Sequence, residues 1–181
     1  MRATGVIRAV DKLGRIVIPK EIRKNFRIKE GDPMEIFTAR EGEIVLKKYS
    51  PLGEMTNFAK AYAKAMADIT KMTVFISDRD QIIASEGKLK KEYENRNLSQ
   101  HLESVMEQRK EINTCKETRL RCSVYEGESV SGKKQLIYPI ISQGDVVGTV
   151  GLISEDKNKN FDEFEEKIIR VAVTYFGSLF I

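Results

Sequence analysis

The chain has 181 residues, 41% of them hydrophobic and 32% charged. This composition provides a packed core for one domain or two small ones and excludes a wholly disordered chain. The sequence contains no run of 18 apolar residues that would span a membrane, and no apolar stretch typical of a signal peptide near its start. Two cysteines and one histidine are a poor supply for disulfides, metal sites or a catalytic triad. We therefore expect a cytoplasmic protein with no cofactor, metal or membrane partner, and not an enzyme.

Positive charge is concentrated at one end of the chain. Residues 1–50 hold 12 Lys and Arg against 7 Asp and Glu, whereas the remainder has 19 basic and 20 acidic residues. Residues 1–29 are more basic still, with 9 basic residues against 2 acidic ones. Such an asymmetry indicates a polyanion as the partner of the first segment only.

The first 50 residues predict a small module of four strands and one helix. In chain order, we expect strands at 4–10 and 15–18, a helix at 20–26, and strands at 34–38 and 44–46. Asp11-Lys12-Leu13-Gly14 predicts the first turn, and Pro19 is typical of the first helical position. Such a module buries little apolar area alone, so we expect it to intertwine with a second copy.

After a short linker at 49–53, the sequence predicts an α+β domain. The expected elements are a helix over 55–69, strands at 73–77 and 81–85, a helix near 98–106, a polar stretch at 113–134, strands at 136–141 and 146–153, and a helix from about 161 toward 181. Two hairpins with flanking helices indicate an antiparallel sheet with helices packed on it. We therefore expect two domains, at 1–51 and 52–181.

The last predicted helix is apolar over an unusually wide arc. Its apolar positions cover roughly 200°, whereas a helix that covers only its own sheet needs about 100°. These positions are Phe161, Phe164, Ile168, Ile169, Val171, Tyr175, Phe176 and Phe180. The excess predicts contact with another subunit; the alternative is a terminal helix deeply embedded in one domain.

Four basic residues of the first module are candidates for a DNA-binding surface. Arg8, Arg15, Arg23 and Lys24 come from different predicted elements that can converge on one face. The planar fork of arginine meets phosphates or guanine edges with two hydrogen bonds. An ordinary solvated basic surface is the alternative.

The runs Thr4-Gly5-Val6-Ile7-Arg8 and Asp11 to Lys24 closely resemble the AbrB-type swapped-hairpin DNA-binding family. Glu35-Ile36-Phe37 and the run from Leu46 to Pro51 match as well, so the resemblance covers residues 1–51 almost continuously. It implies a mainly β domain in which two chains exchange hairpins and present basic side chains to double-stranded DNA.

The same resemblance implies which residues contact DNA. The family's DNA-contacting arginines correspond to Arg8, Arg15 and Arg23. The fourth corresponds to position 24, where this chain has Lys24, which keeps the charge but loses the fork.

The second half resembles a GAF domain, a small-molecule sensor fold. The resemblance rests on the hairpin formed by Tyr138–Ile141 and Gly144–Gly151, with a long helix after it. In that fold the polar stretch 113–134 covers the ligand pocket and acts as a lid; a plain solvated loop is the alternative. Which residues contact a ligand cannot be read from the spacing.

The two resemblances together are typical of a transcription factor family of endospore-forming bacteria. They imply a homotetramer that activates or represses sporulation genes on the nucleoid of the developing spore, modulated by an unidentified small molecule. The alternative is an antitoxin-like or DNA-architectural protein whose second domain only oligomerises.

Three weaker signals predict no further chemistry. Residues 127–134 resemble a phosphate-binding loop, but Lys134 stands where Ser or Thr must hold the metal, and a strand is expected next. Cys115 and Cys122 are expected as free thiols, and His101 as a solvated residue near a helix start.

Overall fold

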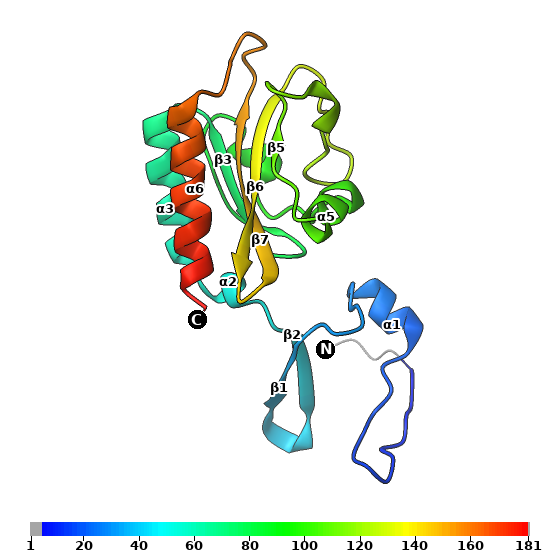
Figure 1. Cartoon of the computed structure of the whole chain (residues 1–181). Helices are drawn as coiled ribbons and strands as arrows, with labels where there is room; N and C mark the ends of the chain where they lie inside the picture. Colours follow the sequence, from blue (N-terminus) through cyan, green and yellow to red (C-terminus); the bar gives the residue numbers. More distant parts are fainter. Residues whose placement is uncertain (1–4, 181) are drawn as a thin grey trace. The chain divides into compact units, whose positions relative to one another are not determined.

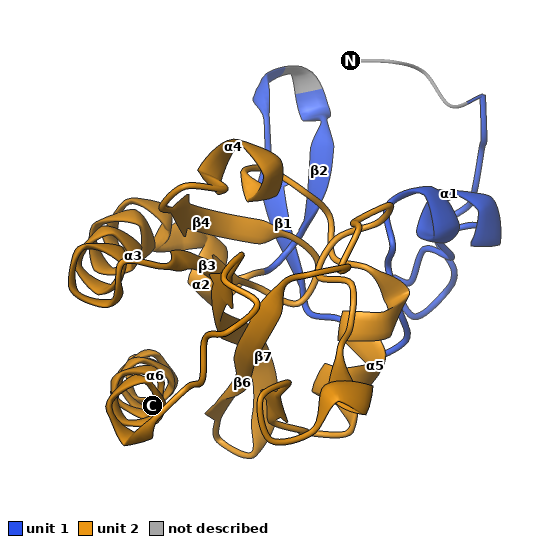
Figure 2. Cartoon of the chain, turned by 90° about the horizontal axis from the view of Figure 1, so that it is seen from above, with its two compact units in different colours: residues 1–49 blue, residues 50–181 orange. Residues whose placement is uncertain are grey.

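The computed structural model in Figure 1 describes residues 5–180. The chain divides into two compact units, an N-terminal unit of residues 1–49 and a C-terminal unit of residues 50–181 (Figure 2).

The N-terminal unit contains one short helix and one hairpin. Its elements are α1 (Lys20–Asn25), β1 (Met34–Thr38), the 3-10 turn η1 (Arg40–Gly42) and β2 (Ile44–Lys48). Strands β1 and β2 pair antiparallel, with Met34 opposite Lys48. The expected helix and hairpin are therefore confirmed, although Pro19 stands at the N-cap of α1 rather than at its first helical position.

The two strands expected at 4–10 and 15–18 are not formed by residues 5–18 of the chain, and residue 4 lies outside the described residues. The turn between them is present, because the N–H of Gly14 donates to the carbonyl of Asp11 at 3.0 Å. A strand needs a neighbour to pair its N–H and C=O groups, and among the described residues none of 5–18 belongs to a sheet. The apolar pattern that predicted the strands is consequently exposed, with Ile7 89% accessible.

The C-terminal unit is an antiparallel sheet with helices on both faces. Its elements are α2 (Pro51–Glu54), α3 (Thr56–Thr70), β3 (Thr73–Ser77), β4 (Ile82–Glu86), α4 (Lys90–Tyr93), α5 (Gln100–Glu107), β5 (Ile112–Asn113), η2 (Thr118–Leu120), β6 (Lys134–Ser142), β7 (Asp145–Ser154) and α6 (Glu163–Ser178). The strand order is β4-β3-β7-β6-β5, and every pairing is antiparallel. Helices α3 and α6 lie side by side on one face, and α5 lies on the other (Figures 1 and 2). The expected α+β architecture is confirmed.

The sheet separates two hydrophobic cores. Val74 and Ile76 of β3 face the core under α3 and α6, whereas Phe75 between them faces the core under α5. This alternation follows from the two-residue period of a strand. Gly151 of β7 leaves the space that the Phe75 ring occupies, since a Cβ at that position would lie 2.1 Å from a ring carbon.

Part of the linker expected at 49–53 belongs to the C-terminal unit instead. Leu52 of α2 is fully buried in the first core, and Gly148 makes room for it, since a Cβ there would lie 2.7 Å from the Leu52 side chain. The hydroxyl of Ser50 caps α2 and donates to the Asp78 carboxylate at 2.8 Å. The chain thus becomes firmly packed two residues after β2 ends at Lys48.

Candidate nucleic-acid interface

The turn before Arg15 is organised by a single carboxylate. The Asp11 Oδ1 atom accepts from the backbone N–H groups of Leu13 at 2.8 Å and Arg15 at 2.9 Å. Its Oδ2 atom accepts from the Nε of Arg15 at 2.7 Å, although the two side chains are 41% and 70% exposed. The backbone and guanidinium N–H groups of Arg15 hold the pKa of the Asp11 carboxyl below its ordinary value. Arg15 therefore projects from an ordered turn with its guanidinium held at one edge.

The other three candidate residues are exposed and lie in two further local structures. Arg8 donates to the neighbouring carbonyl of Ile7 at 3.2 Å. Arg23 and Lys24 occupy the last turn of α1, where a positive charge interacts favourably with the helix dipole. Among residues 5–180, no hydrogen bond or ion pair joins the four basic side chains to one another. All four side chains are exposed, so each can meet an external anion, Arg15 through its two terminal nitrogens.

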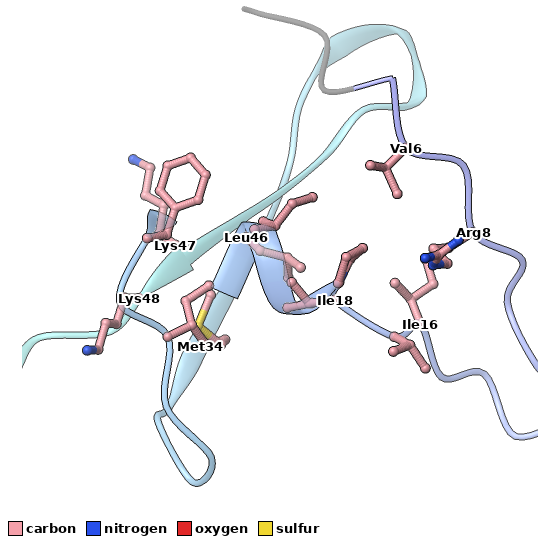
Figure 3. Close-up of a pocket in the computed structure, with 13 residues that line it drawn as sticks. Val6, Arg8, Ile16, Ile18, Met34, Leu46, Lys47 and Lys48 are labelled. Atoms are coloured by element: carbon pink, nitrogen blue, oxygen red, sulfur yellow. The ribbon is translucent and has the colours of Figure 1, made fainter. Parts of the chain in front are cut away.

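A large apolar cavity of about 630 Å³ lies within the N-terminal unit (Figure 3). Val6, Ile16, Ile18, Met34 and Leu46 are labelled around it in Figure 3. The described residues that line it are Val6, Arg8, Ile16, Val17, Ile18, Pro19, Ile22, Phe26, Ile28, Met34, Leu46, Lys47 and Lys48. An exposed apolar surface of this extent on a small unit marks an interaction site.

One basic residue of this unit has an internal role that the sequence pattern did not reveal. Lys48 at the end of β2 pairs with the nearly buried Asp32 carboxylate at 2.9 Å and donates to the carbonyl of Arg27 at 3.1 Å. Asp32 also accepts from the backbone N–H of Lys29 at 2.7 Å. Lys48 therefore fastens the hairpin to the loop after α1.

The wide apolar arc of α6 is divided between the interior and the surface. Ile169 and Phe176 are buried against the sheet, whereas Phe164 and Val171 are 51% and 62% exposed. Tyr175, also on the exposed side, contacts α3. We call the exposed side of the two helices the α3/α6 face, formed by Phe58, Tyr62, Ile69, Phe164, Ile168, Val171 and Tyr175.

Aromatic contacts join the two helices of this face. The rings of Tyr62 and Tyr175 are stacked with centroids 5.7 Å apart, and Phe58 lies 5.7 Å from Tyr175. The α3/α6 face is therefore one continuous, ordered apolar surface rather than two separate stripes.

Residues 113–134 form a fixed cover over the core under α5. The Glu128 side chain is fully buried and accepts from the hydroxyl of Tyr93, the N–H of Val124 and the Nζ of Lys133, the last at 3.1 Å. Burial, together with the Glu128 charge, strongly raises the pKa of the Tyr93 hydroxyl. The cover begins at the last residue of β5, contains η2 and packs Cys122 into the core. A plain solvated loop does not describe it.

The remaining candidate residues have structural surroundings. Cys115 and Cys122 are free thiols, and burial raises the pKa of Cys122 to about 12. His101 is exposed on α5, and residues 127–133 lead into strand β6 rather than into a helix. Within the described part of the chain, no three His, Cys, Asp or Glu side chains gather as metal ligands. No helix among the described residues is long and apolar enough to cross a membrane.

Comparisons with known proteins find a family model that matches most of each unit. The family model described as stage V sporulation protein T C-terminal, transcription factor, matches residues 54–178. The model described as antidote-toxin recognition MazE, bacterial antitoxin, matches residues 7–53. The GAF domain of an Acinetobacter phosphoenolpyruvate-protein phosphotransferase covers 73% of this chain and 82% of its own, with a TM-score of 0.55 at 16% identity. The C-terminal unit therefore has the GAF fold.

Two curated relatives from Bacillus subtilis (strain 168) define the class of protein. The transition state regulatory protein AbrB is 51% identical over 51 residues, which are 28% of this chain and 52% of that protein. An AbrB-like unit followed by a GAF fold is the architecture of a bacterial transcription factor. Stage V sporulation protein T is 42% identical over 177 residues, 98% of this chain and 97% of that protein. The chain belongs to the stage V sporulation protein T family, and the match to the antitoxin model covers residues 7–53.

Proposed function

We propose that this sporulation transcription regulator binds specific double-stranded DNA sequences through residues 1–51 and activates or represses the adjoining genes. The observation that carries the proposal is the exposed basic set Arg8, Arg15, Arg23 and Lys24 on the one unit with a marked positive charge. The 51% identity to AbrB over 51 residues of this chain supports it. Its place of action is the nucleoid, in the cytoplasm of the developing spore, and its role is regulatory rather than catalytic.

The DNA-binding unit in this proposal is a dimer that exchanges hairpins. Residues 5–18 form no strand in the described part of the chain, and the adjoining cavity is lined mainly by apolar side chains. A second copy of the chain meets both needs, because its own residues 5–18 supply strands for pairing and apolar side chains for the cavity.

Residues 52–181 join two such dimers into a tetramer. The α3/α6 face exposes Phe164 and Val171 beside stacked aromatic rings, and burying it against another copy removes this surface from water. Since a GAF unit with one such face can pair only once, two dimers per assembly is the simplest closed arrangement.

The test of DNA binding is the dependence of affinity on salt. Two protomers with three or four basic contacts each neutralise roughly 6–8 phosphates, so the logarithm of affinity falls with the logarithm of salt concentration with a slope of about −5 to −7. Replacement of Arg15 and Arg23 by Ala should abolish measurable binding in fluorescence anisotropy. The charge-matched control, Lys91→Ala with Lys110→Ala in the C-terminal unit, should bind as the wild type. Salt-independent affinity, or full binding by the double arginine variant, overturns the proposal.

Modulation by a small molecule is the last part of the proposal. The GAF fold and the anchored cover at 113–134 support a sensory role for residues 52–181. Ser50, the first residue of the C-terminal unit, is bonded to Asp78 in the turn between β3 and β4, so a change in that turn reaches the chain next to the end of the N-terminal unit. An effector acting there changes DNA affinity by about 5- to 150-fold, the usual range of allosteric coupling.

The sensory role is tested by replacing residues 54–181 with an unrelated tetramerising helix. Loss of regulation under some growth conditions, with DNA binding retained, is the expected result. A chimera that regulates normally under every growth condition shows that the second unit only oligomerises.

A further inference from the structure

We propose that Asp11 is a positioning residue that fixes the Arg15 guanidinium for DNA and thereby makes the regulator selective for sequence. The inference rests on the proposed DNA-binding function and adds a division of labour among its basic residues. Asp11 is one of only 2 acidic residues among the first 29, in a segment with 9 basic residues.

A negative charge in this segment needs a physical reason. Asp11 is exposed, so it repels the phosphates that the surrounding basic residues attract. The charge of the other acidic residue, Glu21, is explained by its position in the first turn of α1, where the helix dipole stabilises an anion. For Asp11 the reason is found in its hydrogen bonds.

The two oxygens of Asp11 perform different tasks. Oδ1 closes the turn by accepting from the backbone N–H groups of Leu13 and Arg15, and Oδ2 holds the Nε of Arg15 at 2.7 Å. An asparagine at this position keeps an Oδ1 acceptor for the turn. Its amide nitrogen, however, would present a donor to the Nε–H donor, so the contact with the guanidinium is lost.

The contact leaves the far end of the guanidinium open. Among residues 5–180, the two terminal nitrogens of Arg15 make no further hydrogen bond or ion pair. This end of the fork matches the two acceptors of a guanine edge or a phosphate. A guanidinium already held at Nε has less freedom to lose when it binds, so the contact is more sensitive to the geometry of its target.

The Asp11–Arg15 pair is also nearly neutral as a unit, so it contributes little to general attraction toward DNA. Arg8, Arg23 and Lys24 supply the attraction that every sequence shares, and Arg15 supplies discrimination. The two contributions respond differently to mutation, because attraction changes affinity for all DNA and discrimination changes the ratio between two DNAs.

The test compares two probes, a duplex enriched by the wild-type protein from random-sequence DNA and a random duplex of the same length. Asp11→Asn should bind the random duplex at least as tightly as the wild type, since it removes a repelling charge. Its preference for the enriched duplex should fall at least about fivefold, because one good bidentate base contact discriminates by roughly 5- to 150-fold. The matched control Glu21→Gln removes a charge without touching Arg15 and should keep the preference.

A double-mutant cycle assigns the effect to the pair. Asp11→Asn combined with Arg15→Ala should be no less selective than Arg15→Ala alone, because the positioned group is already absent. In the free protein, the Nε–H resonance of Arg15 should exchange with water more slowly in the wild type than in Asp11→Asn. Asp11→Ser, whose hydroxyl can cap the turn but cannot hold Nε, should reproduce the loss of preference if the asparagine variant does not fold.

The outcomes separate this inference from the proposed function. If Arg15→Ala leaves DNA binding and preference unchanged, the proposed role of Arg15 in DNA binding is wrong, and the inference falls with it. If Arg15→Ala loses preference while folded Asp11→Asn and Asp11→Ser keep it, the positioning role alone is overturned. If the losses of preference caused by Asp11→Asn and Arg15→Ala add up in the double variant, the positioning role is overturned as well.

Discussion

The buried ion pair between Lys133 and Glu128 should contribute strongly to the stability of the C-terminal unit. Their side chains are 12% and 0% exposed, so Lys133→Met leaves the Glu128 carboxylate buried without its cation. Removing one partner of a buried pair costs about 3–5 kcal/mol. For a unit of this size that loss lowers the melting temperature by about 10–20 °C. The chain has no tryptophan, so far-ultraviolet circular dichroism in urea is a suitable measurement.

A second ion pair provides the matched control. Lys90 and Glu86 pair on the surface at 2.8 Å with side chains 41% and 23% exposed, so Lys90→Met should cost no more than about 0.5 kcal/mol. Adding Glu128→Gln to Lys133→Met removes the uncompensated charge and keeps an acceptor for Tyr93, so it should restore much of the lost stability. Equal losses in the two lysine variants, or a double variant less stable than Lys133→Met, would refute this reasoning.

Three further experiments test other parts of the structure. Val171→Glu on the α3/α6 face should convert the larger oligomer into dimers in light scattering, whereas Lys167→Glu at an exposed polar neighbour should not. An unchanged mass for the Val171 variant contradicts the proposed tetramer. Leu52→Ala should destabilise the C-terminal unit by about 2–5 kcal/mol in urea unfolding, because the side chain is fully buried, and a loss below about 1 kcal/mol would show that α2 is not anchored. At pH 8 iodoacetamide should modify Cys115 and spare Cys122, whose buried thiol has a pKa of about 12 and becomes a thiolate only as the pH approaches that value; equal labelling of the native protein contradicts its burial.

Local sequence patterns determined most of the secondary structure. The strand expected at 73–77 is β3 residue for residue, and the turn at Asp11–Gly14 forms as its Asp and Gly predict. These features depend on side-chain alternation and turn chemistry over a few residues, so neighbours in the sequence are sufficient to specify them. The likeness of residues 1–51 to the AbrB family was equally readable, because it rests on a continuous run.

The tertiary structure decided which of the patterned residues are buried and which polar residues act together. Leu52 looked like part of a linker, but the space at Gly148 makes it a core residue. Glu128, Lys133 and Tyr93 form one buried network although 35 residues separate Tyr93 from Glu128. The apolar pattern of α6 did not reveal that Ile169 packs on the sheet while Val171 remains exposed.

The segments at 5–10 and 15–18 show the limit of the sequence most directly. Their β-branched residues specify an extended backbone, but pairing is a property of two segments that come together in space. Among the described residues these two segments join no sheet, so the pattern is present and the strands are not. The sequence by itself determined local conformation and family membership, because both depend on residues that are adjacent in the chain. Burial, charge pairing and strand pairing depend on groups distant in the chain, and only the tertiary structure decided them.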